Sequence, residues 1–345
     1  MSLANLRFLI CHLRQGCIDC KRLIGKDGGR LWTIADLEIP NSFEMIEYNN
    51  KVWFRHILNF HKTDTFRILL WEMVVVAVYT AIVAAVEIYI LRDLRMSTSN
   101  DTVGAALKNT TIMHSILGFV LSLLVVFRTN TAYDRWWEGR KLWGALVNNT
   151  RNLAVKINAF LPESCKAERK FFNTMIGGFP TALKEHLRDG IKLDEIDDVE
   201  GFKESFGDRE HVPSMMIQAM YRKTKSLYDA GHLSGDELIV VDKELKSFFD
   251  IMGACERIKS TPIPFSYSIF LKKFIFFYII TLPIGFVAYF EYWAIPISVF
   301  VFYVLVSLEI IAEEIEMPFG LDANDLPTQK LSEMISRNVD EIFAA

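Results

Sequence analysis

The feature that most constrains this chain is a helix-forming stretch, Ile112–Leu146, that changes character halfway along. Its first half, IMHSILGFVLSLLVVF, is apolar, and its second half, RTNTAYDRWWEGRKLWGAL, is charged and aromatic, with no proline in either. A helix that begins near Ala105 and rises about 1.5 Å per residue crosses a hydrocarbon layer of ~30 Å by Phe127. Because the charged half must then continue into water, the sequence predicts one helix that passes from membrane to solvent.

The apolar half of this stretch has two different faces. Phe119, Leu123 and Phe127 occupy positions i, i+4 and i+8, which places three large apolar side chains in one row oblique to the helix axis. Roughly a hundred degrees round the helix lie small residues of the kind that let neighbouring membrane helices approach closely. These small residues are Ser115, Gly118 and Ser122. Since an apolar row in a membrane helix is usually core or lipid contact, spacing alone assigns it no function.

The composition fits a membrane protein with a substantial soluble part. Hydrophobic residues make up 51% of the 345 positions, while charged residues still make up 23%. The net charge of −4 is too small to indicate a nucleic-acid partner. The five cysteines form no disulfide framework, and Cys17 and Cys20 lack the second ligand pair of a structural zinc site. We therefore expect free thiols in a reducing compartment.

The fold class expected is an all-α membrane protein with four transmembrane helices and a cytosolic helical domain. Periodic apolar positions between Arg128 and Ser260 indicate amphipathic helices, and hardly any of that region has a strand pattern. Lysine and arginine flank the central region and precede the first span, so the positive-inside rule places both termini and the central helices on the cytosolic side. The expected segments are a cytosolic N-terminal segment (1–67), the first two transmembrane helices (68–127, the second continuing to about 160), the cytosolic domain (128–268), the last two transmembrane helices (269–312) and a cytosolic C-terminal tail (313–345).

Three motifs in this order resemble the bestrophin family, and the first and last have the form found in its bacterial and plant-plastid members more than the animal form. They are RTNTAYDRWWEGR at Arg128–Arg140, TPIPFSY at Thr261–Tyr267 and PFGLDANDLP at Pro318–Pro327. The resemblance implies a homopentameric ion channel in which five copies of the second helix line one central pore. Many members conduct chloride and other small monovalent anions, whereas some bacterial members favour monovalent cations. The expected location is a plasma membrane or an organelle membrane such as the plastid thylakoid.

The resemblance also implies where the pore narrows. The family's neck is formed by three apolar residues just before the Arg-Trp-Trp sequence, and these positions are Phe119, Leu123 and Phe127 here. These are the same three residues that helical spacing alone places in one row. A second constriction, the cytosolic aperture, falls near the start of a later helix, where Asp236 and Leu238 are both candidates. An acidic Asp236 there would favour cations, and Leu238 would be neutral.

Calcium is the one candidate cofactor. Glu313, Asp322 and Asp325 match carboxylate positions of the calcium clasp in animal bestrophins. Calcium needs several oxygen ligands, but Met317 replaces a polar ligand and the acidic run is thinned by two uncharged residues. The alternative is that these carboxylates cap helices and pair with basic residues of the N-terminal segment.

The function expected from the sequence is therefore a chloride-conducting channel whose partners are small inorganic ions, membrane lipid and further copies of the chain. A monovalent cation channel of the bacterial type and a non-conducting membrane scaffold are the alternatives. A membrane enzyme that uses His114 or the carboxylates of the spans is not expected, since the sequence has no Glu-x-x-His pair and no nucleotide-binding loop.

Overall fold

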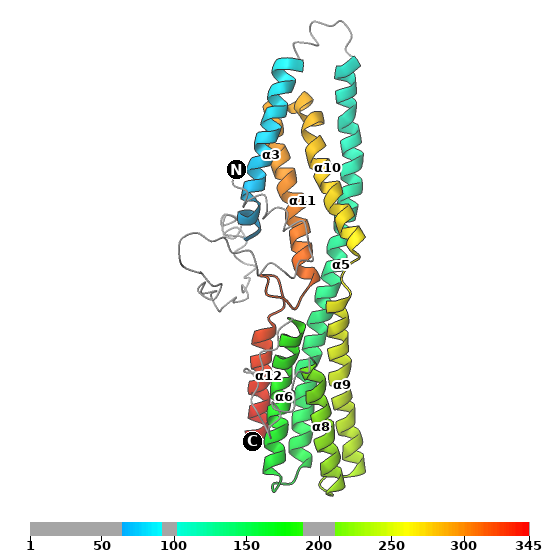
Figure 1. The fold of residues 1–345 in the computed structure, drawn as a ribbon, viewed down its shortest axis with the longest axis vertical. Coiled ribbons are helices and arrows are strands. Elements are labelled where there is room, and N and C mark those ends of the chain that lie inside the picture. The colour runs from blue at the N-terminus through cyan, green and yellow to red at the C-terminus, as the bar shows by residue number, and fades with distance from the viewer. Residues whose placement is uncertain (1–63, 92–101, 189–210, 345) are drawn as a thin grey trace, which may run out of the picture. The chain divides into compact units, whose positions relative to one another are not determined.

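The computed structural model describes residues 64–91, 102–188 and 211–344 (Figure 1). The expected N-terminal segment, including Cys17 and Cys20, lies almost entirely outside these ranges. Within them every regular element is helical, as the sequence predicted. In chain order the elements are α3 (Asp64–Ala85), the π-helical turn η5 (Val86–Leu91), α5 (Thr102–Phe160), α6 (Lys166–Leu187), α8 (Val212–Asp229), α9 (Gly235–Ser260), α10 (Phe265–Phe290), the 3-10 turn η7 (Glu291–Trp293), α11 (Ala294–Glu316) and α12 (Thr328–Ala344).

Three of the described stretches are long and apolar enough to cross a membrane. They are Thr65–Ile90, Thr110–Phe160 and Phe265–Glu316. The third stretch contains two helices, α10 and α11, which contact each other and also contact α3, as Figure 1 shows. Leu271, Ile275 and Ile279 of α10 form an apolar cluster with Leu121 and Val125 of α5. Helices α5 and α10 therefore pack against each other through buried aliphatic side chains.

Helix α5 connects the apolar helices with the rest of the chain. Its 59 residues correspond to a length of about 88 Å, roughly three times the thickness of a hydrocarbon layer. It contacts α10 and α11 along one part of its length and α6, α9 and α12 along another (Figure 1). With no proline from Thr102 to Phe160, nothing in the sequence interrupts its backbone hydrogen bonding.

The helical bundle, defined here as α6, α8, α9, α12 and residues 137–160 of α5, has its own core. Trp143, Phe172, Phe179 and Phe248 are completely buried in it. The rings of Phe179 on α6 and Phe248 on α9 meet edge to face, with centroids 4.9 Å apart, which is the arrangement aromatic pairs favour. Large rings contributed by different helices thus hold the bundle together.

The turn between α8 and α9 fixes where α9 begins. Gly231 has φ +78°, a conformation that costs glycine little and that ends α8. Ser234 then caps α9: its Oγ accepts the N–H of Glu237, and the Glu237 carboxylate accepts the N–H of Ser234 at 2.7 Å. This reciprocal capping box sets the register of the first turn of α9, which carries both candidate aperture residues.

Candidate functional site

The apolar half of α5 buries one face and leaves the opposite face open. The buried residues on this half recur at helical spacing: His114, Leu121, Val125 and Arg128. The predicted row points the other way, with Phe119 at 65%, Leu123 at 44% and Phe127 at 62% exposed. At about 100° per residue, the centre of this row lies nearly opposite the buried face. The row is therefore on the surface of the single chain and is not part of its core.

The small residues predicted to form one packing face divide into two kinds. A Cβ atom added at Gly118 would lie 2.8 Å from Oη of Tyr278 on α10, so the absence of a side chain here permits the close approach of α5 and α10. Ser115 and Ser122 are exposed, and their hydroxyls donate to the carbonyls of Thr111 and Phe119 in α5 itself. Within the single chain, close packing thus occurs at Gly118, and packing of the two serines against a neighbouring helix stays a prediction.

His114 is used for packing between α5 and α10. Its Nδ1 lies 2.9 Å from the carbonyl oxygen of Thr110, and its Nε2 lies 3.0 Å from Oγ1 of Thr281. Both ring nitrogens of this buried side chain are therefore engaged in hydrogen bonds.

A buried charge cluster lies directly after the exposed row. Arg128 is 2% exposed, and its Nη1 lies 2.7 Å from Oε2 of Glu316 at the end of α11. Its Nε lies 3.7 Å from Oε1 of Glu309, about two turns earlier on the same helix. Charges removed from water are stable only when they are paired, so this arginine fixes the position of α11 against α5 at this level.

A second arginine extends the cluster to the linker between α9 and α10. Nε of Arg135 donates to the carbonyl of Glu316 at 3.0 Å, and its two Nη atoms donate to the carbonyls of Ile258 and Thr261. The N–H of Ile263 donates to Oε1 of Glu316 at 2.6 Å. We call Arg128, Arg135, Glu309 and Glu316 the charged junction. It joins α5, α11 and the proline-containing linker at one point.

The third sequence motif meets the same region of α5. The indole N–H of Trp136 donates to the carbonyl of Asn324 at 3.0 Å. A Cβ atom at Gly139 would lie 3.2 Å from side-chain atoms of Pro318 and Phe319, so a larger residue here would require these rings to move by a few tenths of an ångström. All three motifs singled out in the sequence thus converge on the middle of α5. The partner of Arg128 was not predicted from the sequence.

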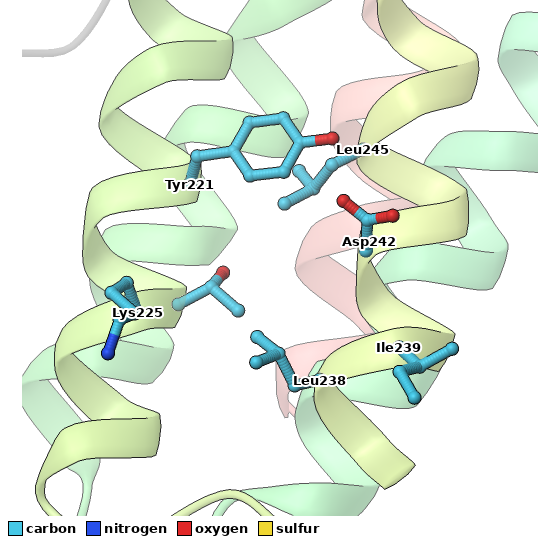
Figure 2. A pocket seen from close by; sticks show the side chains of 7 residues that line it. Tyr221, Lys225, Leu238, Ile239, Asp242 and Leu245 are labelled. Atoms are coloured by element: carbon cyan, nitrogen blue, oxygen red, sulfur yellow. The ribbon is translucent and has the colours of Figure 1, made fainter. Parts of the chain in front are cut away.

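The two aperture candidates point in different directions. Leu238 lines a cavity of about 310 Å³ between α8 and α9, together with Tyr221, Asp242 and other side chains shown in Figure 2. Asp236 is exposed at the start of α9, and Ile239, which the sequence analysis did not single out, is 69% exposed. Leu238 is therefore half-buried, and Asp236 is available to a second copy or to solvent. Ile239 is largely exposed although it also lines the cavity.

The three calcium candidates do not form a ready site. The Glu313 carboxylate accepts hydrogen bonds from Nζ of Lys272 at 2.9 and 3.1 Å. Oδ2 of Asp325 accepts the N–H of Asp322 at 2.7 Å, and the side chain of Asp322 is exposed. Within the described ranges, no set of three ligand atoms lying within 4.8 Å of one another includes them. Calcium dependence stays a prediction from the resemblance, measurable as the difference in current between chelator and micromolar calcium.

Two relatives of this chain share most of its length. The voltage-dependent anion channel-forming protein alr2987 of Nostoc sp. is 33% identical over 279 residues, which cover 78% of this chain and 88% of the relative. The voltage-dependent anion channel-forming protein YneE of Escherichia coli K12 is 31% identical over 235 residues, covering 66% of this chain and 75% of the relative.

The fold and the family profile agree with these relatives. A crystal structure of a bacterial bestrophin homologue from Klebsiella pneumoniae superimposes with a TM-score of 0.70 at 26% identity, covering 80% of this chain and 98% of that chain. The sequence profile of the family described as Bacterial/Fungal Bestrophin protein matches residues 45–341, a range that contains the exposed row, the charged junction and all three motifs. The chain therefore belongs to the bacterial and fungal bestrophin family.

Proposed function

We propose that this chain is an anion-conducting membrane channel whose pore is lined by the row Phe119, Leu123 and Phe127 of α5. The observation that carries the proposal is the exposure of this row on a helix whose opposite face is buried. Three large apolar side chains facing away from the chain need lipid, a second copy or a pore opposite them. The names of the Nostoc and Escherichia coli relatives, both called anion channel-forming, favour the pore.

The channel is a homopentamer with four transmembrane helices per chain. These helices are α3, the N-terminal part of α5, α10 and α11, with η7 as the turn between the last two. Five copies of α5 around one axis turn the row into three stacked apolar rings. Both ends of the chain and the helical bundle lie on the cytosolic side, because the flanking lysines and arginines follow the positive-inside rule.

An apolar neck of this kind both conducts and closes. It offers little to replace the water around an ion, so weakly hydrated anions pass more readily than strongly hydrated ones, and a slight narrowing empties it of water. The edges of phenylalanine rings carry positive potential, so Phe119 and Phe127 favour anions when their edges face the axis. Chloride is the physiological anion proposed.

The charged junction holds the neck in place. Arg128 directly follows Phe127 and is paired with Glu316, which also accepts the N–H of Ile263 in the linker. A displacement of the linker or of α11 is therefore transmitted to the last ring of the neck. We propose that the bundle opens and closes the pore through this contact.

A second constriction is formed by the start of α9. Of the residues there, Asp236 and Ile239 are exposed and Leu238 faces the cavity of Figure 2. If Asp236 faces the ion path, Asp236→Asn raises the permeability of chloride relative to potassium. An unchanged permeability ratio would remove Asp236 from the path and leave Ile239 as the candidate.

The proposed function is tested by reconstituting the purified full-length chain in a planar bilayer with a potassium chloride gradient. A reversal potential near the chloride equilibrium potential supports the proposal. A reversal potential near that of potassium identifies a cation channel, and the absence of any unitary current in protein that native mass spectrometry shows to be a homopentamer identifies a non-conducting scaffold.

A further inference from the structure

Two histidines and one glutamate converge at the ends of three helices of the bundle. They are His186 in the last turn of α6, His211 immediately before α8 and Glu256 on α9. Nε2 of His186 lies 2.9 Å from Oε1 of Glu256, and Nε2 of His211 lies 2.8 Å from the same oxygen. The imidazole centroids are 4.4 Å apart. Among the described residues, this is the one group of three whose ligand atoms all lie within 4.8 Å of one another.

We propose that His186, His211 and Glu256 bind a divalent transition metal ion, with zinc as the best match. Imidazole nitrogens suit zinc, copper, nickel and iron, whereas calcium and magnesium prefer oxygen ligands in larger number. Two histidines and one glutamate with an open fourth position form a donor set that zinc adopts in proteins. The site is separate from the proposed pore, and its presence or absence does not decide whether the chain conducts anions.

The geometry is close to what a bound ion needs. Zinc lies about 2.0–2.2 Å from nitrogen and oxygen ligands, so tetrahedral coordination places neighbouring ligand atoms about 3.3 Å apart. The two separations from Glu256 are 2.9 and 2.8 Å, so each needs to open by a few tenths of an ångström. Side-chain adjustment supplies such a movement without rebuilding the three helices.

The surroundings leave room for the ion and its water. The side chains of His186, His211 and Glu256 are 22%, 43% and 31% exposed, respectively. The group is therefore accessible from solvent. His211 precedes α8 but makes no capping hydrogen bond with its side chain, and its Nε2 already faces Glu256. Lys259 lies nearby, but its Nζ donates to the carbonyl of His186 at 3.1 Å.

A metal ion here cross-links the ends of α6, α8 and α9 close to the linker that begins at Thr261. Binding to the folded chain stabilises it in proportion to the free metal concentration. At a hundredfold excess over the dissociation constant, the unfolding temperature of the full chain is expected to rise by about 4 °C. The ligand set also predicts that calcium and magnesium give no such rise.

The test is titration of metal-free, detergent-solubilised full-length protein with zinc chloride by calorimetry, together with thermal unfolding. The proposal predicts one zinc ion per chain and a loss of affinity on the order of a hundredfold in Glu256→Gln, because one of three ligands is replaced. His232→Ala, a change at an exposed histidine in the turn between α8 and α9, serves as the matched control and binds zinc like the wild type.

X-ray absorption on the zinc-loaded wild type identifies the atoms bound to zinc, so the proposal can be tested even if a variant misfolds. Two imidazole ligands at about 2.0 Å are expected. Absence of zinc binding to the wild type, a spectrum without imidazole, or binding to folded Glu256→Gln as tight as to the wild type would each overturn the proposal. A spectrum with two imidazoles together with weakened binding in Glu256→Gln supports it.

Discussion

Nη1 of Arg128 lies 2.7 Å from Oε2 of Glu316, with the two side chains only 2% and 8% exposed. The residues are far apart in sequence, one in the middle of α5 and the other at the end of α11. Glu309 lies beside them, and both its carboxylate oxygens lack a hydrogen-bond partner within the described part of the chain. The positive charge of Arg128 therefore lies beside two buried carboxylates, and its removal takes away the cation that pairs with both.

Replacing Arg128 with methionine should be strongly destabilising. Loss of one partner of a buried ion pair costs about 3–5 kcal/mol, because the remaining charge stays buried without compensation. The measurement is thermal unfolding of the purified protein in detergent. Lys225→Met is the control, since Lys225 and Asp229 form an ion pair in which both side chains are more than half exposed, and such a pair contributes about 0.3–0.5 kcal/mol. Equal effects of the two changes would contradict the role given to the charged junction.

A side chain at Gly118 should disturb the contact between α5 and α10. Even Gly118→Ala places a Cβ atom 2.8 Å from Oη of Tyr278, and Gly118→Leu extends the clash, so the yield of assembled oligomer in native mass spectrometry should fall in that order. Tyr278→Phe removes the clashing oxygen and should restore part of the loss caused by Gly118→Ala. Normal assembly of Gly118→Leu would show that α5 and α10 can move apart at this point without preventing assembly of the oligomer.

The stability of the chain should depend on the protonation of Asp325. Burial raises the pKa of Asp325 to about 7, and the hydrogen bond from the N–H of Asp322 offsets this only in part. Because the folded chain holds this proton more tightly than the unfolded chain, the contribution of Asp325 to the free energy of unfolding is complete below about pH 4 and is lost as the pH rises through 7.

Asp325→Asn should therefore flatten the dependence of the unfolding temperature on pH between about pH 4 and 7. The amide retains an oxygen that accepts the N–H of Asp322 but has no proton to release. Asp250→Asn, at an exposed position on α9, is the control and should keep the wild-type profile. A profile that is unchanged in Asp325→Asn would show that another group titrates.

Much of the architecture was predictable from the sequence, because it follows from local pattern. The uninterrupted apolar run before Arg128 and the amphipathic pattern after it predict a continuous helix, and α5 is unbroken from Thr102 to Phe160. The all-helical class and the family also follow from periodicity and from motifs that lie in the right order. The exposed direction of Phe119, Leu123 and Phe127 agrees with their shared helical row.

The contacts between distant segments were not predictable, because a single sequence does not show which charged residues become neighbours in the fold. Nothing in the spacing joins Arg128 to Glu316 or Gly118 to Tyr278. Leu238 stays a candidate for the aperture, and the sequence did not predict that it also lines a cavity between α8 and α9. His186, His211 and Glu256 form no sequence motif at all, so only the packing of three helices brings them together.

The neck is the central claim, and single-channel recording of a triple alanine variant at Phe119, Leu123 and Phe127 tests it most directly. As a control, Met113→Ala with Val120→Ala changes residues that are 63% and 41% exposed on the flank of the same helix, and its conductance should stay near that of the wild type. If the three rings restrict and gate the path, the triple variant widens and wets the constriction. Its unitary current should then rise, and its open probability should no longer depend on any ligand. A folded, pentameric triple variant with wild-type conductance and gating would contradict the account.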